Sequence, residues 1–402
     1  MTTATAPSPA SPYRDHKRYA WIVSLLVPAT TALGPLQYMA WPHPLALWAP
    51  VIFYYCIAPL IDLALGPDTS NPPEEAVPAL EADRYYRVVT YLLVPLLWGS
   101  FVFSAWFVMR TPLGWGSWIA MVMTTGAIGG YCINLGHELG HKRTRLERWL
   151  AKIALAPTFY GHFTIEHNRG HHRDVATFAD SASARMGESI WRFVLREMPG
   201  AFARAWQLER ARMLADGQRF WSLRNELIQP ALMTFALWAA LCAWLGPEVL
   251  LFLVPASLWA NFQLTTANYV EHYGLMRRTG PDGRVERCEP HHSWNSNHVF
   301  SNWAMFHLQR HSDHHAHPAR RYQSLRHFED LPQLPNGYFG MFPVAYFPPV
   351  WFWLMDRRLV AAVGGDASRI NFDPARRARL CAKFGLAEPE PDPAPVHPQP
   401  AA

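Results

Sequence analysis

A histidine-rich stretch at residues 137–142 reads HELGHK. Two histidines four residues apart on a helix face the same way, so His137 and His141 can bind one metal ion. Taken alone, the stretch fits the zinc protease pattern H-E-x-x-H, in which Glu138 would act on a water molecule. An intramembrane zinc protease is therefore the first hypothesis to weigh against the rest of the chain.

Three further stretches carry histidines: EHNRGHH (166–172), NYVEHYGL (268–275) and LQRHSDHHA (308–316). Pairs spaced i, i+3 or i+4 aim at one point, and the second residue of each HH points about 100° away toward another. A zinc site is complete with about four ligands, so this many imidazoles favour two ions. Iron fits best, although spacing does not separate iron from manganese or zinc. The candidate ligands are His137, His141, His167, His171, His172, His272, His311, His314 and His315.

Six apolar stretches are long enough to place these histidines at a membrane surface, since a spanning helix needs about 20 residues. Arg110 is the only one of the 36 Lys and Arg residues on the side of the short connections. The positive-inside rule therefore predicts that the opposite side, with both termini and the histidines, is cytoplasmic. We expect an all-α integral membrane protein with six transmembrane helices and a cytoplasmic histidine-rich cap. The predicted spans are 19–40, 45–66, 88–109, 114–136, 227–246 and 248–270.

The composition supports this organisation. The chain is 50% hydrophobic and only 17% charged, below the roughly 25% of soluble domains. Five scattered cysteines without C-x-x-C suit a reducing compartment, and no basic stripe indicates nucleic acid binding. A metal transporter would instead spread its histidines along a path through the bilayer. The predicted segments are a polar arm (1–18), four spans (19–136), a cytoplasmic segment with amphipathic helices (137–226), two spans (227–275), a cytoplasmic C-terminal part (276–385) and a Pro-rich tail (386–402).

The wording of the four stretches resembles a known family. HELGHK, EHNRGHH and LQRHSDHHA resemble the three histidine boxes of membrane-bound di-iron hydroxylases and desaturases, and NYVEHYGL resembles the additional box of the alkane 1-monooxygenase family. The order of the boxes and the six spans match too, over roughly residues 15–385. A fatty acyl desaturase and an aromatic side-chain hydroxylase are the nearest alternatives.

The resemblance implies hydroxylation of the terminal methyl of medium-chain n-alkanes at two non-haem iron ions held by the nine histidines. One atom of O₂ enters the 1-alkanol and the other leaves as water. Electrons come from rubredoxin, which an NAD(P)H-dependent rubredoxin reductase reduces. We expect the protein in the bacterial inner membrane, with its donor either separate or fused beyond the Pro-rich tail.

Helical spacing also suggests how an apolar substrate reaches the metals. Leu264 precedes His272 by eight residues, Ile133 precedes His137 by four, and Leu308 precedes His311 by three. We expect these three to line a slot that admits the methyl end first. Tyr54, on the second span, is expected to stop the far end of the chain.

Polar neighbours of the boxes have two expected roles. Imidazole ligands usually donate their second N–H to an acceptor, and an acidic electron donor needs a basic face. His291, His292 and His298 are expected in a loop over the site. The orienting candidates are Glu138, Glu166, Glu271, Asp313, Asn134 and Asn168, and the docking candidates are Arg143, Arg145, Arg148, Arg173, Arg320 and Arg321.

Overall fold

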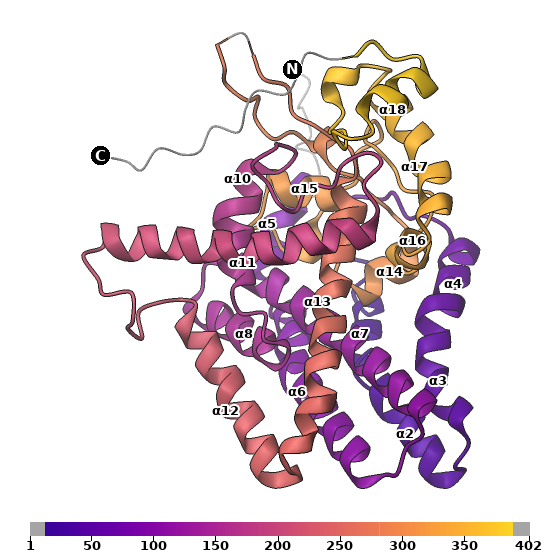
Figure 1. The fold of residues 1–402 in the computed structure, drawn as a ribbon, viewed down its shortest axis with the longest axis vertical. Coiled ribbons are helices and arrows are strands. Elements are labelled where there is room, and N and C mark those ends of the chain that lie inside the picture. Colours follow the sequence, from indigo (N-terminus) through magenta and orange to yellow (C-terminus); the bar gives the residue numbers. More distant parts are fainter. Residues whose placement is uncertain (1–12, 281, 389–402) are drawn as a thin grey trace, which may run out of the picture.

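Long helices form a bundle, and shorter helices gather at one end of it, in a computed structural model of the chain (Figure 1). The structure describes residues 13–280 and 282–388, and these contain isolated bridges but no β-strand. Residues 1–12 of the predicted arm and 389–402 of the predicted tail lie outside the described residues. The long helices are α3 (Pro44–Ile52), continued by η2 (Phe53–Ile57) and α4 (Ala58–Leu65), α6 (Arg84–Arg110), α7 (Trp115–Gly140), α12 (Ile228–Leu245) and α13 (Leu250–His272).

The predicted membrane spans are found as helices. Among the residues that the structure describes, five helices are long and apolar enough to cross a bilayer, and there are six if a bent pair is counted as one span. The prediction of a multi-pass, all-α membrane protein is therefore confirmed, whereas the side that faces the cytoplasm stays a prediction. The five are Pro44–Leu65, Arg84–Arg110, Trp115–Gly140, Ile228–Leu245 and Pro247–His272.

The first predicted span is broken rather than continuous. Helix α1 (Val23–Leu26) and helix α2 (Thr30–Ala40) meet at an angle of 50°. Pro28 lies at the break, where its missing N–H interrupts the helical ladder. The hydroxyls of Thr30 and Thr31 bond the carbonyls of Val27 and Pro28 at 2.6 Å, which satisfies polar groups that lipid could not.

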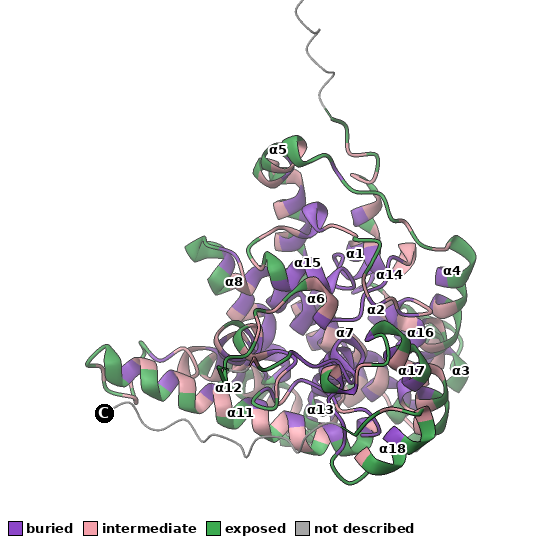
Figure 2. Cartoon of the chain, turned by 90° about the horizontal axis from the view of Figure 1, so that it is seen from above, coloured by how far each residue is buried: buried purple, intermediate pink, exposed green. Residues whose placement is uncertain are grey.

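Helices α7 and α13 form the centre of the bundle. Figure 2 shows buried residues concentrated around them. In an apolar 18-residue stretch of α7, 78% of the residues are buried inside the protein, against 17% in the corresponding stretch of α12 at the periphery. The two central helices approach closely because Gly129 lacks a side chain: a Cβ there would lie 2.6 Å from the Cβ of Ala260. Their packing brings His137 and His272 to the same end of the bundle.

Shorter helices cover that end. The long helix α11 lies across the spans and runs out past α12 (Figure 1). It matches the predicted amphipathic part of the segment 137–226. The covering elements are α5 (Val77–Ala82), α8 (Arg145–Leu155), α9 (Phe163–Glu166), η5 (His167–His171), α10 (His172–Asp174), α11 (Ile190–Ala215), α14 (Val299–Ala304), α15 (His311–Ala316), α16 (Tyr338–Ala345), α17 (Pro348–Ala362) and α18 (Arg377–Phe384).

Candidate metal centre

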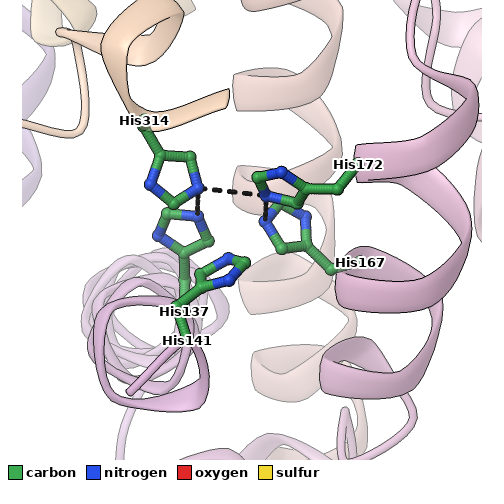
Figure 3. A group of neighbouring side chains, drawn as sticks. All are labelled: His137, His141, His167, His172 and His314. Atoms are coloured by element: carbon green, nitrogen blue, oxygen red, sulfur yellow. Dashed lines mark hydrogen bonds between the residues drawn. The ribbon is translucent and has the colours of Figure 1, made fainter. Parts of the chain in front are cut away.

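The four histidine stretches meet at this end. Nine imidazoles form two groups, and within each the candidate nitrogen atoms lie within 4.8 Å of one another. Figure 3 shows the imidazoles of the larger group converging from separate helices. Each HH pair is split between the groups, as the spacing predicted. The five-histidine group is His137, His141, His167, His172 and His314, and the four-histidine group is His171, His272, His311 and His315.

Helix ends supply most of these side chains. Helix α7 carries His137 in its last turn and His141 at its C-cap, and both belong to the five-histidine group. His311 and His315 lie one turn apart on α15 and share the four-histidine group. The i, i+4 rule therefore holds in these two stretches.

EHNRGHH departs from the rule because His167–His171 form a π-helix. A π-turn closes its hydrogen bond at i+5 and changes which side chains share a face. The Nε2 atoms of His167 and His172, five residues apart, lie 3.1 Å from each other. The pairing of His167 with His171 that α-helical spacing predicts is wrong, since His171 joins the other group.

Ring nitrogens face each other inside both groups. Nε2 of His314 lies 2.8 Å from that of His137 and 3.1 Å from that of His172. Nε2 of His311 lies 3.1 Å from that of His272 and 2.9 Å from that of His315. A ring nitrogen holds either one proton or one lone pair, so a nitrogen with two such neighbours cannot form two good hydrogen bonds. A bound cation resolves this conflict.

Most of these rings are also in the neutral state that metals require, whereas Asp180 raises the pKa of His171 despite its burial. Seven of the nine are buried, and His141 and His172 are half-buried. Burial lowers the pKa of His167, His311 and His314 well below the ordinary value, which keeps these imidazoles neutral. The Nε2 atoms of His141 and His171 are buried without a hydrogen-bond partner. The donor set therefore fits metal ions bound through imidazole nitrogen.

Asp180 is a site residue that the sequence reasoning missed. Its fully buried carboxylate accepts a hydrogen bond from Nδ1 of His171 at 3.0 Å and another from Ser183 Oγ at 2.7 Å. Burial opposes its charge, yet His171 holds the pKa of Asp180 well below the ordinary value. This contact fixes the proton on Nδ1 and leaves Nε2 of His171 free for a metal. An acid shortly after EHNRGHH, in DSAS (180–183), was the available signal.

Among the predicted orienting residues, Glu271 lies against a candidate ligand. Its Oε2 is 3.4 Å from Nε2 of His311, and Tyr338 donates a hydrogen bond to its other oxygen at 2.9 Å. Ser293, which the sequence did not single out, places its hydroxyl 3.5 Å from Nδ1 of His272.

The other five predicted orienting residues make their contacts elsewhere. Their ion pairs and side-chain hydrogen bonds are with basic side chains and backbone carbonyls instead of imidazoles. Glu138 pairs with Lys142 at 3.0 Å, Asp313 with Arg320 at 2.9 Å and Glu166 with Arg204 at 4.0 Å, while Asn134 and Asn168 donate to the carbonyls of Met305 and Gly140 at 3.1 Å.

An apolar cavity leads from the bundle interior toward the histidines. Its volume is about 80 Å³, and Tyr54, Leu264 and Leu308 line it. A smaller space of about 10 Å³, lined by His137, His167 and His311, shares Leu264 and Leu308 with it. Both leucines, together with Asn134 and Ala267, therefore line the cavity as well as the space beside the histidines.

Ile133 does not line the cavity and packs with Leu155, Tyr160, Phe163 and Leu264 in a separate apolar cluster. Seen down the helix axis, Asn134 and Ile133, three and four residues before His137, lie to either side of His137. Asn134 lies on the cavity side, so Ile133 faces away and the prediction for it is wrong.

Three of the six predicted docking arginines line one depression. Arg143, Arg320 and Arg321 line an open depression of about 730 Å³ together with Arg87 and Lys142. Arg320 pairs with Asp313 and Arg321 with Glu147. Arg145, Arg148 and Arg173 are exposed but lie outside this depression.

Comparisons with known proteins agree with this architecture. Residues 112–345 match the family model described as fatty acid desaturase. The chain is 52% identical to alkane 1-monooxygenase 1 of Alcanivorax borkumensis, over 93% of both chains, and 50% identical to alkane 1-monooxygenase of Ectopseudomonas oleovorans, over 94% of both. The xylene/toluene monooxygenase hydroxylase component XylM of Pseudomonas putida is 29% identical over 55% of this chain and 58% of its own length. The chain belongs to the fatty acid desaturase family and, by its similarity to the first two relatives, to the alkane 1-monooxygenases, a family of oxidoreductases.

Proposed function

We propose that this enzyme is a non-haem di-iron monooxygenase that converts medium-chain n-alkanes to 1-alkanols. The observation that carries the proposal is an apolar cavity that ends at the two histidine groups. An alkane partitions into the bilayer and loses no hydrogen bonds on entering such a cavity. Relatives with half of their residues identical are named for the same reaction.

The side chains have separable roles in this proposal. The five-histidine and four-histidine groups would each hold one iron ion, Asp180 would orient His171 through Nδ1, and Glu271 would lie beside the metal-facing Nε2 of His311. Bound iron supplies the activation of O₂, which no side chain here provides. Leu264 and Leu308 narrow the path, so that the chain enters end-on and its terminal methyl arrives before any internal methylene. The apolar lining excludes water and so protects reactive species from side reactions.

Rubredoxin, reduced by rubredoxin reductase, is the proposed electron donor. Lys142 and Arg143, in the basic depression, directly follow His141 in the chain. An acidic donor protein docked there would approach the five-histidine group closely, and charge complementarity would speed the encounter. By the positive-inside rule this face is cytoplasmic, in a bacterial inner membrane.

A reconstituted assay tests the proposal. Octane is incubated with iron-loaded enzyme, rubredoxin, rubredoxin reductase and NADH, and the products are separated by gas chromatography. We expect 1-octanol, and two iron ions per chain by metal analysis. Reduced, iron-loaded enzyme that forms no 1-octanol would contradict the proposal. The variant His137→Ala is the matched control for background oxidation.

Aromatic side-chain hydroxylation is the second candidate, favoured by the similarity to XylM. The same assay with an alkylbenzene decides between them, because the preferred substrate has the higher kcat/KM. We propose that the n-alkane has the higher kcat/KM, because the cavity narrows at Leu264 and Leu308 and a ring is wider than an alkyl chain.

Chain-length preference is proposed to depend on Tyr54. This side chain lines the cavity, stacks on Phe339 at 5.7 Å, and bonds Thr30 Oγ1 at 2.6 Å. The variant Tyr54→Ser should shift the product profile toward longer alkanols. An unchanged profile over a mixture of alkanes would refute this role.

A further inference from the structure

The far end of α11 and the segment that follows it carry unneutralised positive charge. The carboxylates of this region are already paired: Glu209 with Arg169 at 3.0 Å and Arg212 at 2.6 Å, and Glu226 with Lys152 at 3.6 Å. Asp216 pairs with Arg212 at 2.9 Å. Among the described residues, no ion pair or side-chain hydrogen bond reaches the exposed guanidinium groups of three arginines, Arg210, Arg219 and Arg224.

Large apolar side chains lie beside these arginines. Trp206, Phe220 and Trp221 form a chain of rings with centroids 4.6 and 5.2 Å apart. Trp221 is 76% exposed and Leu223 is 71% exposed. Exposed aromatic rings mixed with arginine are typical of a segment that lies in a membrane interface. There the apolar part of each side chain contacts acyl chains and the polar part contacts water or headgroups.

The position in the fold agrees with this. Arg224 lies four residues before Ile228, where α12 begins. Only 17% of the apolar window of α12 is buried by protein, so lipid must cover the rest. Arg224 therefore lies close to the level at which α12 leaves the hydrocarbon, and α11, which carries Arg210, crosses the bundle above the start of α12 (Figure 1).

We infer that Arg210, Arg219 and Arg224 form a binding site for the headgroups of anionic phospholipids, with Trp221 and Leu223 inserted among the acyl chains beside α12. The unpaired guanidinium groups supply the charge, and phosphate accepts their planar donors. This interaction surface is independent of the proposed reaction. It anchors α11, whose Glu197 accepts a hydrogen bond from Thr265 at 2.7 Å near the histidine groups.

Native mass spectrometry of the full chain, released from micelles containing equal amounts of phosphatidylglycerol and phosphatidylcholine, tests the site. The wild type should retain phosphatidylglycerol in preference to phosphatidylcholine. The triple variant R210Q/R219Q/R224Q should lose at least about fivefold in affinity for phosphatidylglycerol, since each arginine near an anionic surface adds to the attraction. The control R284Q/R287Q/R379Q removes the same formal charge from exposed residues outside this segment and should retain the preference.

Equal retention of the two lipids by the wild type would overturn the inference, and so would an unchanged preference in the triple variant. Circular dichroism and metal content should match the wild type in both variants, because none of the six arginines contacts the histidine groups. The single variant Leu223→Ser keeps all charges. It should weaken retention of both lipids alike, which separates insertion from headgroup binding.

Discussion

The histidine centre and a third cluster in the loop above it make an instructive pair. Glu286, His291 and His292 also bring three candidate ligand atoms within 4.8 Å of one another. In the third cluster, however, Nδ1 of His292 accepts the backbone N–H of Glu289 at 2.9 Å, and its Nε2 meets Glu286 at 2.9 Å. The ring proton must therefore lie on Nε2, where it bonds Glu286 and blocks a metal.

In the histidine centre, the proton of His171 lies on the other ring nitrogen, Nδ1. Nδ1 of His171 donates outward to Asp180, so its Nε2 is left with a lone pair inside the group. Proximity of ligands is the same in both regions, and the partner of the second ring nitrogen decides which of them can bind a metal. Burial and the nearby His291 lower the pKa of His292 to about 4, so His292 is a neutral ring that ties its loop together.

The largest effect is expected from removing a ligand. His137→Ala and His311→Ala each take one imidazole from a different group, and each should abolish octane hydroxylation while the protein stays folded. Metal analysis should show that each variant loses metal. Full metal content together with wild-type turnover in either variant would show that the histidine removed is not a metal ligand.

Asp180→Asn should have the next largest effect. All nine imidazoles remain, but the amide no longer holds the proton of His171 by charge, and such changes cost about 10- to 100-fold in metal affinity or activity. Competition with a chelator measures the affinity. Asp313→Asn is the matched control, because Asp313 is equally buried yet pairs with Arg320; an equal loss of metal affinity in both variants would show a merely structural role.

Glu138→Gln should lower activity by only a few-fold. Glu138 pairs with the buried Lys142 and not with an imidazole, so the change weakens an ion pair and leaves the metal ligands in place. The melting temperature should fall more clearly than kcat. Complete loss of hydroxylation would restore Glu138 to the catalytic role that H-E-x-x-H assigns to it.

His292→Ala should leave the number of bound metal ions unchanged. The third cluster loses its capping contact with Glu289, and the loop of residues 286–293 should become more accessible to hydrogen exchange. Zinc or iron bound by the wild type and absent from this variant would mean that the third cluster is a metal site after all.

Much of the fold and of the candidate site can be predicted from the residues alone. Six apolar runs of spanning length predict the helices, because lipid leaves the backbone no alternative to internal hydrogen bonds. The HH pairs predict two metal points, because adjacent residues on a helix diverge by about 100°. The broken first span was not predicted, although Pro28 was its visible cause.

The grouping of the histidines, and the polar side chains that contact them, depend on how the chain folds. His167 pairs with His172 because η5 is a π-helix, a local departure that spacing does not announce. Asp180 contacts His171 although it lies nine residues away in the sequence. Glu138 and Asp313 are adjacent to candidate ligands in the sequence, but they pair with Lys142 and Arg320. Ile133 faces away from the cavity because the packing of α7 on α13 fixes the rotation of the helix. Side-chain type and spacing thus limit what can bind, and the folded geometry selects among the possibilities.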